Sequence, residues 1–212
     1  MHYFDIHTHR IPLHPSQAIV SIDASALPLD GKVVHASIGI HPWHLTETNA
    51  GNLWKTLKSS IKDQRIVAIG EAGLDKLKGP DMTFQTSVFR QEITLAESAN
   101  LPMVIHCVRA FNELIQIKKE SKPKQPWIIH GFRGKPSIAQ ELLKHGFWLS
   151  FGSHYQEESL KITPLNCMFV ETDESEESIG NIYQRIAETK GISLEELVEA
   201  INKNVQEVFF KS

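Results

Sequence analysis

The chain has 212 residues, of which 41% are hydrophobic and 22% charged, and its formal net charge is -3. This composition is typical of a folded globular protein. The negative net charge excludes extended, non-specific binding to nucleic acid. No stretch approaches the roughly 20 apolar residues of a membrane span, and the N-terminal residues lack the pattern of a signal peptide.

The two cysteines, Cys107 and Cys167, lie far apart and form no Cys-x-x-Cys pair. We therefore expect free thiols in a cytoplasmic protein that has no membrane contact and no obligate protein partner. Because no linker, repeat or low-complexity segment divides the chain, we expect residues 1–212 to form a single domain.

Eight short runs rich in β-branched or aromatic residues predict strands. Most of them are apolar throughout, as expected of parallel strands that are covered on both faces. The eight runs are residues 2–6, 17–22, 33–40, 66–70, 102–106, 126–130, 147–151 and 167–171. Between the later runs, helices are predicted over residues 50–63, 84–99, 109–120, 136–145 and 179–190.

The first two connections lack a helical pattern. Residues 10–16 are too few and too rich in proline for a helix, and residues 23–32 indicate a loop or a wide hairpin turn. A last helix begins at the capping box of Ser193 and Glu196, and its apolar stripe is assigned to the core. Strand–helix alternation predicts an α/β fold, and eight strands predict a (β/α)8 TIM barrel. Such a barrel must be trimmed, because 212 residues lie near the lower limit of that fold.

Six potential metal ligands stand at the ends of these apolar runs. His7 and His9 are two residues apart, and side chains two apart on a strand lie on the same face. Their imidazoles would therefore point to the same side. Glu71 follows the apolar run IVAIG, where a carboxylate is costly unless it is paired or bound to a metal. In chain order the six are His7, His9, Glu71, His106, His130 and Asp173.

Taken singly, these residues have simpler interpretations: His-x-His as a surface pair, and Glu71 as a salt bridge at a strand end. In a barrel, however, the C-terminal ends of the strands meet on one face, where function concentrates. A set that mixes imidazoles and carboxylates suits one or two divalent cations such as zinc, manganese or magnesium. The set as a whole therefore predicts a metal site at that end of the barrel.

These residues and their surroundings resemble the TatD family of metal-dependent hydrolases, within the amidohydrolase superfamily. The resemblance runs in order from residue 1 to about residue 210. The matching segments are Asp5-Ile6-His7-Thr8-His9, Gly39-Ile40-His41-Pro42, Gly70-Glu71-Ala72-Gly73-Leu74-Asp75, Gln85 with Phe89, Leu95 with Ala96, His106 after LPMVI, His130-Gly131-Phe132 with Gly134, Glu171-Thr172-Asp173, and Asn204 with Phe209.

The resemblance implies a distorted (β/α)8 barrel that binds two divalent cations, Mg, Mn or Zn. It divides the ligands into His7, His9 and Asp173 for one ion, His106 and His130 for the other, and Glu71 bridging both. It further implies a metal-activated water, with Asp173 as the general base and Glu71 as a catalytic residue. The expected activity is that of a deoxyribonuclease that hydrolyses phosphodiesters, exonucleolytically, with DNA as its nucleic-acid substrate.

The chain departs from the family pattern at several substrate positions. The family's His-Pro-His appears as His41-Pro42-Trp43-His44, so we assign His41 to substrate binding or to support of the metal ligands and give His44 no role. Arg109 stands three residues after a metal ligand instead of two, and Arg133 lies near His130. Both arginines are candidates for binding a phosphate, and ordinary surface arginines are the alternative.

An acidic run follows Asp173, comprising Glu174, Glu176 and Glu177. One interpretation is a helix N-terminus, where the helix dipole favours carboxylates. The other is negative charge beside the site, which would oppose a long polyanion. His154 either faces the site or is an ordinary loop residue.

Two further functions stay open at this stage. A hydrolase with the same cations could act on a carboxyl ester or amide, such as the bond in a mischarged aminoacyl-tRNA. Alternatively, a catalytically idle barrel could serve as a binding module, although such a protein would have no need for all six ligands.

Overall fold

The computed structural model describes residues 2–27 and 29–210, and its eight strands form one sheet in chain order. Every pair of neighbouring strands is parallel. The strands are β1 (Asp5–Thr8), β2 (Ala18–Asp23), β3 (Ala36–Gly39), β4 (Ile66–Asp75), β5 (Met103–Val108), β6 (Trp127–Ile129), β7 (Phe147–Phe151) and β8 (Met168–Val170). A parallel bridge between Thr8 and Asp173 joins the two ends of the sheet, so the barrel is nearly closed.

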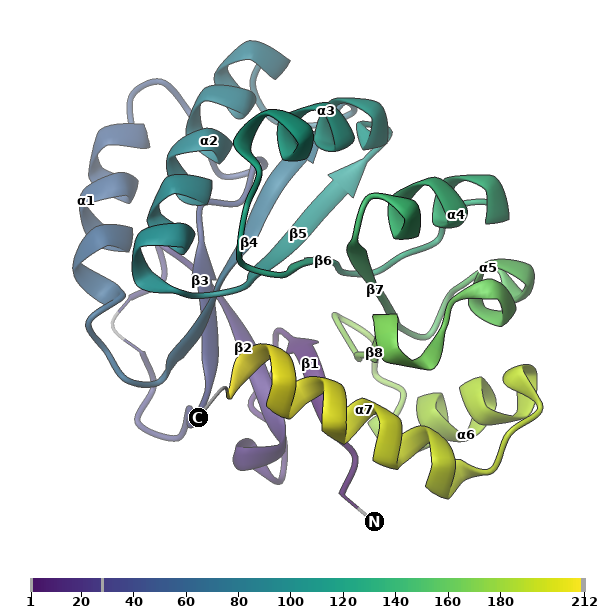
Figure 1. The fold of residues 1–212 in the computed structure, drawn as a ribbon. Coiled ribbons are helices and arrows are strands. Elements are labelled where there is room, and N and C mark those ends of the chain that lie inside the picture. The colour runs from purple at the N-terminus through teal and green to yellow at the C-terminus, as the bar shows by residue number, and fades with distance from the viewer. Residues whose placement is uncertain (1, 28, 211–212) are drawn as a thin grey trace.

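Helices surround β3 to β8 on the outside of this barrel (Figure 1). They are α1 (Ala50–Ser60), α2 (Met82–Ala99), α3 (Phe111–Ser121), α4 (Pro136–Lys144), α5 (Glu157–Ile162), α6 (Ile179–Lys190) and α7 (Leu194–Phe209), with the short 3-10 helices η1 (Pro15–Gln17) and η2 (Leu165–Cys167). The predicted α/β barrel is therefore confirmed.

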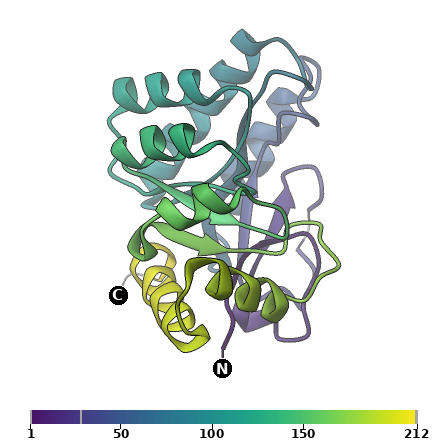
Figure 2. The same cartoon turned by 90° about the vertical axis from the view of Figure 1, so that its right-hand side faces the viewer.

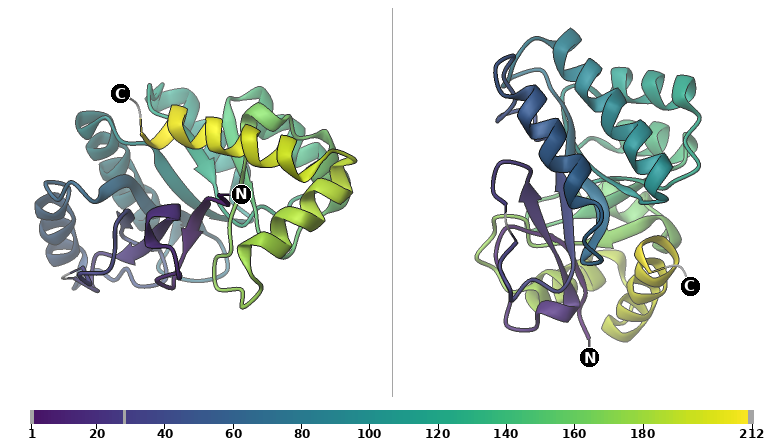
Figure 3. Two further views of the ribbon diagram at one scale, coloured as in Figure 1. Left: turned by 90° about the horizontal axis from the view of Figure 1, so that it is seen from below. Right: turned by 90° about the vertical axis from the view of Figure 1, so that its left-hand side faces the viewer.

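The barrel is trimmed on its N-terminal side, as predicted. Only η1 separates β1 from β2, and the described residues between β2 and β3 contain no helix. Loops therefore cover the outside of these strands (Figure 2). The C-terminal helix α7 lies across the base of the molecule (Figure 3), where the amide of Asn204 donates to the carbonyl of Met168 at 2.9 Å. The predicted cap of this helix is present, since Ser193 accepts from the N–H of Glu196.

Three elements differ most from the prediction. Strand β1 spans Asp5–Thr8 instead of residues 2–6, so His7 lies inside it. Strand β4 continues to Asp75 instead of ending near residue 70, so Glu71 lies inside the strand. Gly73 makes this continuation possible: it has a φ of +147°, and a Cβ there would collide with the carbonyl oxygen of His106 on β5. Helix α5 was not predicted, because its six residues are too few to show a helical period.

Cys107 and Cys167 are free thiols, as expected. Among the described residues, no helix combines the length and the hydropathy needed to cross a membrane.

Candidate metal centre

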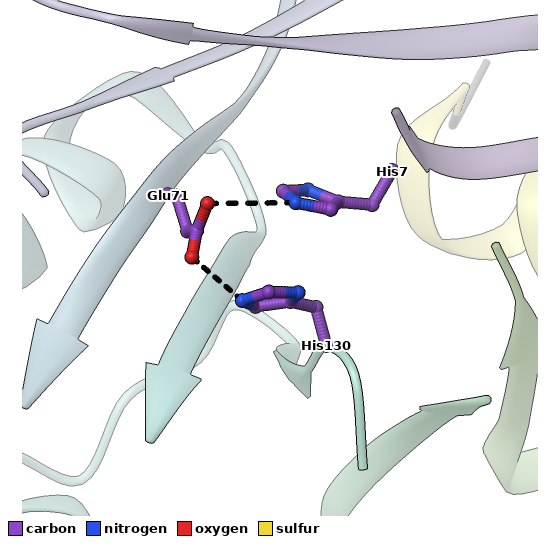
Figure 4. A group of neighbouring side chains, drawn as sticks. All are labelled: His7, Glu71 and His130. Carbon is purple, nitrogen blue, oxygen red and sulfur yellow. Dashed lines mark ion pairs between the residues drawn. The ribbon is translucent and has the colours of Figure 1, made fainter. Parts of the chain in front are cut away.

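Glu71 lies at the centre of a cluster of histidines that come from four different strands or strand ends. Its Oε1 atom is 3.0 Å from His41 Nε2, 2.9 Å from His106 Nδ1 and 2.7 Å from His130 Nε2. Its Oε2 atom is 3.5 Å from His7 Nε2 and 3.6 Å from His9 Nε2. Figure 4 shows the carboxylate between His7 and His130, with one oxygen directed at each ring.

Asp173 completes the cluster on the side where the barrel closes. Its Oδ1 atom lies 3.7 Å from His7 Nε2 and 3.5 Å from His9 Nε2. The backbone fixes this arrangement, because the N–H of Asp173 donates to the carbonyl of His7 at 2.8 Å and that of His9 donates to Asp173 at 3.3 Å. The structure thus brings all six predicted ligands together.

The ring of His7 gives the strongest sign that this cluster holds a cation. The residue is fully buried, and within the described part of the chain neither of its ring nitrogens has a hydrogen-bond partner. A buried imidazole without a hydrogen bond is costly, and a metal ion bound to its nitrogen would offset that cost. Ligand atoms of His7, His9 and Asp173 lie within 4.8 Å of one another, and so do those of His7, Glu71 and His130.

Charges within the cluster shift several pKa values. Burial opposes ionisation of Glu71, but the surrounding histidines, His130 above all, hold the pKa of its carboxyl well below the usual range. Burial likewise opposes the charge on His130, and the carboxylates of Glu71 and Glu171 raise the pKa of its imidazole well above normal. The hydrogen bond to Asp173, and then that to Glu71, raises the pKa of His9 to about 9. Without a cation, the carboxylate of Glu71 therefore pairs with the protonated rings of His9 and His130. A bound cation would displace the protons of these rings.

Two buried carboxylates that the sequence analysis did not assign to the site orient ligand histidines. Each lies near the ring nitrogen that is directed away from Glu71. Asp75 Oδ2 lies 3.1 Å from His106 Nε2, which directs Nδ1 of that ring into the cluster. Glu171, fully buried, accepts from the N–H of Gly131 and lies 3.5 Å from His130 Nδ1. The sequence did contain a signal for both residues. Asp75 stands four residues after Glu71, and Glu171 stands two residues before Asp173. Residues an even number of positions apart on a strand lie on the same face.

A third unassigned carboxylate, Asp5, ties the two ends of the sheet together. It accepts from the hydroxyl of Thr172 at 2.6 Å and from the backbone N–H groups of Thr172 and His7 at 3.1 and 3.2 Å. Burial raises the pKa of Asp5 to about 7, against the effect of these hydrogen bonds. Asp5 thereby positions His7 relative to the segment that carries Asp173.

The predicted substrate residues lie around two adjoining cavities. One, of about 340 Å³, is lined by the cluster and by Ser21, Asp23, Trp43 and His44. The other, of about 490 Å³, is lined by Arg109, Arg133 and several apolar side chains and shares Trp43, His106, His130 and Asp173 with the first. Arg109 and Arg133 therefore face a space that is continuous with the candidate metal site.

The three remaining histidines of the prediction lie in different settings. His41 is buried and bonded to Glu71, so it supports the cluster as well as lining the cavity. His44, to which no role was given, pairs through Nδ1 with Asp23 at 3.0 Å. His154 bonds to Ser153 and lines a smaller cavity of about 220 Å³ beside Arg133.

The acidic run does not form a helix N-terminus, since α6 begins only at Ile179 and its first turn contains no acidic residue. Glu176 pairs with Arg10 at 3.6 Å, and Glu177 pairs with Arg185 at 2.8 Å. Glu174 lines both cavities that adjoin the cluster and makes no ion pair within the described residues. One unpaired carboxylate therefore remains at the mouth of the site.

Comparison with known proteins agrees with this geometry. The family model described as TatD related DNase matches residues 22–210. The uncharacterized metal-dependent hydrolase YabD of Bacillus subtilis is 31% identical over 200 residues, which are 83% of this chain and 77% of that protein. The 3'-5' ssDNA/RNA exonuclease TatD of Erwinia tasmaniensis is 30% identical over 148 residues, 65% of this chain and 57% of that protein.

Among solved structures, the TatD homologue YJJV of Escherichia coli superimposes with a TM-score of 0.80 at 18% identity, over 100% of this chain and 99% of that one. This likeness establishes the shared barrel fold. The match of the family model over residues 22–210 and the 31% identity to YabD show that the chain belongs to the TatD family of metal-dependent hydrolases.

Proposed function

We propose that this protein hydrolyses phosphodiester bonds at the ends of nucleic acids, with DNA as the principal substrate, by means of two divalent cations. The observation that carries the proposal is the carboxylate of Glu71, which is contacted through one oxygen by His41, His106 and His130 and through the other by His7 and His9. Such a carboxylate is suited to bridge two ions, with His7, His9 and Asp173 around one and His106 and His130 around the other.

When bound, such cations lower the pKa of a water and offset charge on a phosphoryl oxygen. The side chains of this protein supply the remaining functions. Burial opposes ionisation of Asp173, but His9, and then the charges of His7 and His130, hold the pKa of its carboxyl below the usual value. Asp173 is therefore ionised near neutral pH and serves as the general base that accepts the proton of the attacking water.

The substrate is proposed from three considerations. A relative of similar sequence is named as an exonuclease of single-stranded DNA and RNA. Arg109 and Arg133 line the larger cavity and can meet phosphates there. Glu174 stands at the same mouth and disfavours a long polyanion, which suits an enzyme that takes up only the end of a strand.

Release of nucleotides from end-labelled single-stranded and duplex DNA, with magnesium, manganese or zinc, would test this proposal. The wild type should release nucleotides, whereas a His7→Ala, His9→Ala double variant should lose at least a hundredfold of the rate. His2→Ala, an exposed histidine outside the cluster, is the matched control. A wild-type rate no greater than that of the double variant rejects the nuclease.

The number of ions is tested separately by elemental analysis of the purified, metal-loaded protein. We expect two ions per chain in the wild type and fewer than one in Glu71→Gln, because the bridging ligand is removed. One ion per chain in the wild type would make the site mononuclear.

Glu174 also supports a second candidate, hydrolysis of a carboxyl ester that carries less negative charge than DNA. Assaying carboxyl-ester substrates in parallel separates the two, because activity confined to the esters would replace the phosphodiesterase.

A further inference from the structure

We propose that Trp43 is the platform on which the base of the terminal nucleotide stacks, so that the enzyme selects ends with an unpaired base. This inference rests on the proposed function, whose substrate it makes more specific. Trp43 stands between Pro42 and His44, where the related motif His-Pro-His has no residue.

The indole of Trp43 is held in one orientation although it is not buried. Its Nε1 donates to Asp75 Oδ2 at 2.6 Å, and its backbone N–H donates to His41 Nδ1 at 3.1 Å. The side chain nevertheless keeps 42% of its surface exposed. Because the ring is already fixed, a ligand that stacks on it would bind at little cost in side-chain ordering.

The position of this ring relative to the candidate metal site suits a nucleotide. Trp43 lines both cavities that adjoin the cluster, and its ring centroid lies 5.5 Å from that of His106 and 5.0 Å from that of His41. The cavity of about 490 Å³ is further lined by Phe111 and Phe132. A base placed against the indole would thus have apolar surroundings while its phosphate remains beside the cluster.

The charges around the same cavity match a phosphate-bearing ligand. Arg109 and Arg133 are exposed and make no ion pair or side-chain hydrogen bond within the described residues. The remaining four arginines each pair with a carboxylate; they are Arg10, Arg65, Arg90 and Arg185. Among the described residues, the two guanidinium groups that make no ion pair therefore line the same cavity as the indole. Aromatic platforms combined with basic side chains are how proteins bind single-stranded nucleic acid.

Lys78 adds to this arrangement. Its Nζ atom lies 3.6 Å from the centroid of the Trp43 ring. Because Lys78 is exposed, a base can displace it from the indole, and its ammonium group then becomes available to a neighbouring phosphate.

The decisive experiment compares single-stranded oligonucleotides whose attacked end carries a normal or an abasic terminal nucleotide. Wild type should release the normal nucleotide on the order of tenfold faster, the size expected of one stacked base. Trp43→Leu should lose this preference by slowing more on normal ends than on abasic ends, and Trp43→Phe should retain most of it because a flat ring remains. Trp54→Leu is the matched control, since Trp54 lies on α1 away from these cavities.

Two results would overturn the inference: a wild type without the preference, or a Trp43→Leu variant that slows equally on both ends. Equal slowing would mean that Trp43 acts only by positioning Asp75 and His106. Trp43→Phe is informative here as well, since it removes the bond to Asp75 but keeps a ring.

A binding measurement separates this inference from the proposed hydrolysis. Deoxyadenosine monophosphate should quench the tryptophan fluorescence of the wild type and of Trp54→Leu, whereas 2-deoxyribose 5-phosphate should not, and Trp43→Leu should show no such difference. Quenching without hydrolysis of any nucleic acid rejects the nuclease and leaves the platform. If the protein hydrolyses nucleic acid but shows neither the quenching difference nor the preference for normal ends, the stacking role of Trp43 is rejected and the nuclease is retained.

Discussion

Asp75 and His106 are joined by a 3.1 Å contact between Oδ2 of the carboxylate and Nε2 of the imidazole. Since the other ring nitrogen, Nδ1, is directed at Glu71 at 2.9 Å, Asp75 decides which nitrogen of His106 is free to bind a metal. Asp75 itself is fixed by Trp43 and by the side chain of Gln85, which accepts from its backbone N–H at 2.8 Å.

Replacing Asp75 by Asn should therefore lower metal affinity without unfolding the protein. The amide nitrogen cannot accept from His106, so the ring loses its preferred tautomer, and we expect affinity for zinc or manganese to fall about 10- to 100-fold. Isothermal titration calorimetry measures this change. Asp81→Asn, which alters an exposed cap of α2, should leave the affinity unchanged, and equal affinities in Asp75→Asn and wild type would contradict this role.

Metal binding should release protons, to an extent that depends on His9. Without a cation, its carboxylate partners raise the pKa of His9 from 6.5 to about 9. The stabilisation that these ion pairs give the metal-free protein is fully present below pH 6.5 and is lost as pH rises through about 9. A cation needs the neutral ring, so its affinity should rise over the same range.

Calorimetry in buffers of different ionisation enthalpy counts the released protons. His9→Gln should release up to about one proton fewer than wild type at pH 7.5 and should show a shallower rise of metal affinity with pH. An unchanged proton count would show that His9 is already neutral in the metal-free protein.

Removing the charge of Glu174 should strengthen binding of nucleic acid. This carboxylate lines both cavities and has no ion-pair partner in the part of the chain that the structure describes. We expect Glu174→Gln to bind a short single-stranded oligonucleotide on the order of threefold more tightly at low salt, and less so at high salt. Glu176→Gln is the control because Glu176 already pairs with Arg10. Equal gains in affinity for the oligonucleotide in both variants would contradict a specific effect of Glu174.

Replacing Gly73 by Ala should damage both stability and the metal site. The added Cβ would overlap the backbone of His106, and the φ of +147° is strained for any L-residue with a side chain. Strands β4 and β5 must then separate, and we expect the free energy of unfolding to fall by about 2 kcal/mol or more. Gly31→Ala, where a Cβ meets nothing within 4 Å, should change stability little in the same denaturant titration.

The sequence predicted the barrel and the six candidate ligands because both depend on local patterns. Apolar runs mark buried parallel strands, and the position just after each run marks the open end of a barrel. Such patterns do not tell which atoms meet across the barrel. Glu71 lies inside β4 and not just after it, because the strand extends to Asp75, and this extension depends on the close approach of Gly73 to β5.

The supporting residues were harder to find for the same reason. Asp5, Asp75 and Glu171 are buried carboxylates that each hold a ligand or its backbone. The spacing of Asp75 and Glu171 from candidate ligands indicates a shared strand face, but the atoms that they reach are seen only in the folded structure. The role of His41 was left open between substrate binding and support, since the sequence does not show that its Nε2 reaches Glu71. Helix α5 was missed because six residues carry too little periodicity.

The meeting of the first and last strands has a consequence for the lifetime of the protein. His7 and His9 lie at the end of β1, and Asp173 follows β8, so a cation held by all three would link the two edges of the sheet. Because the three ligands come together only in the folded chain, such a cation binds the folded state in preference to the unfolded state and stabilises it by mass action. Metal supply in the cell would then govern how fast the protein is degraded as well as how fast it works.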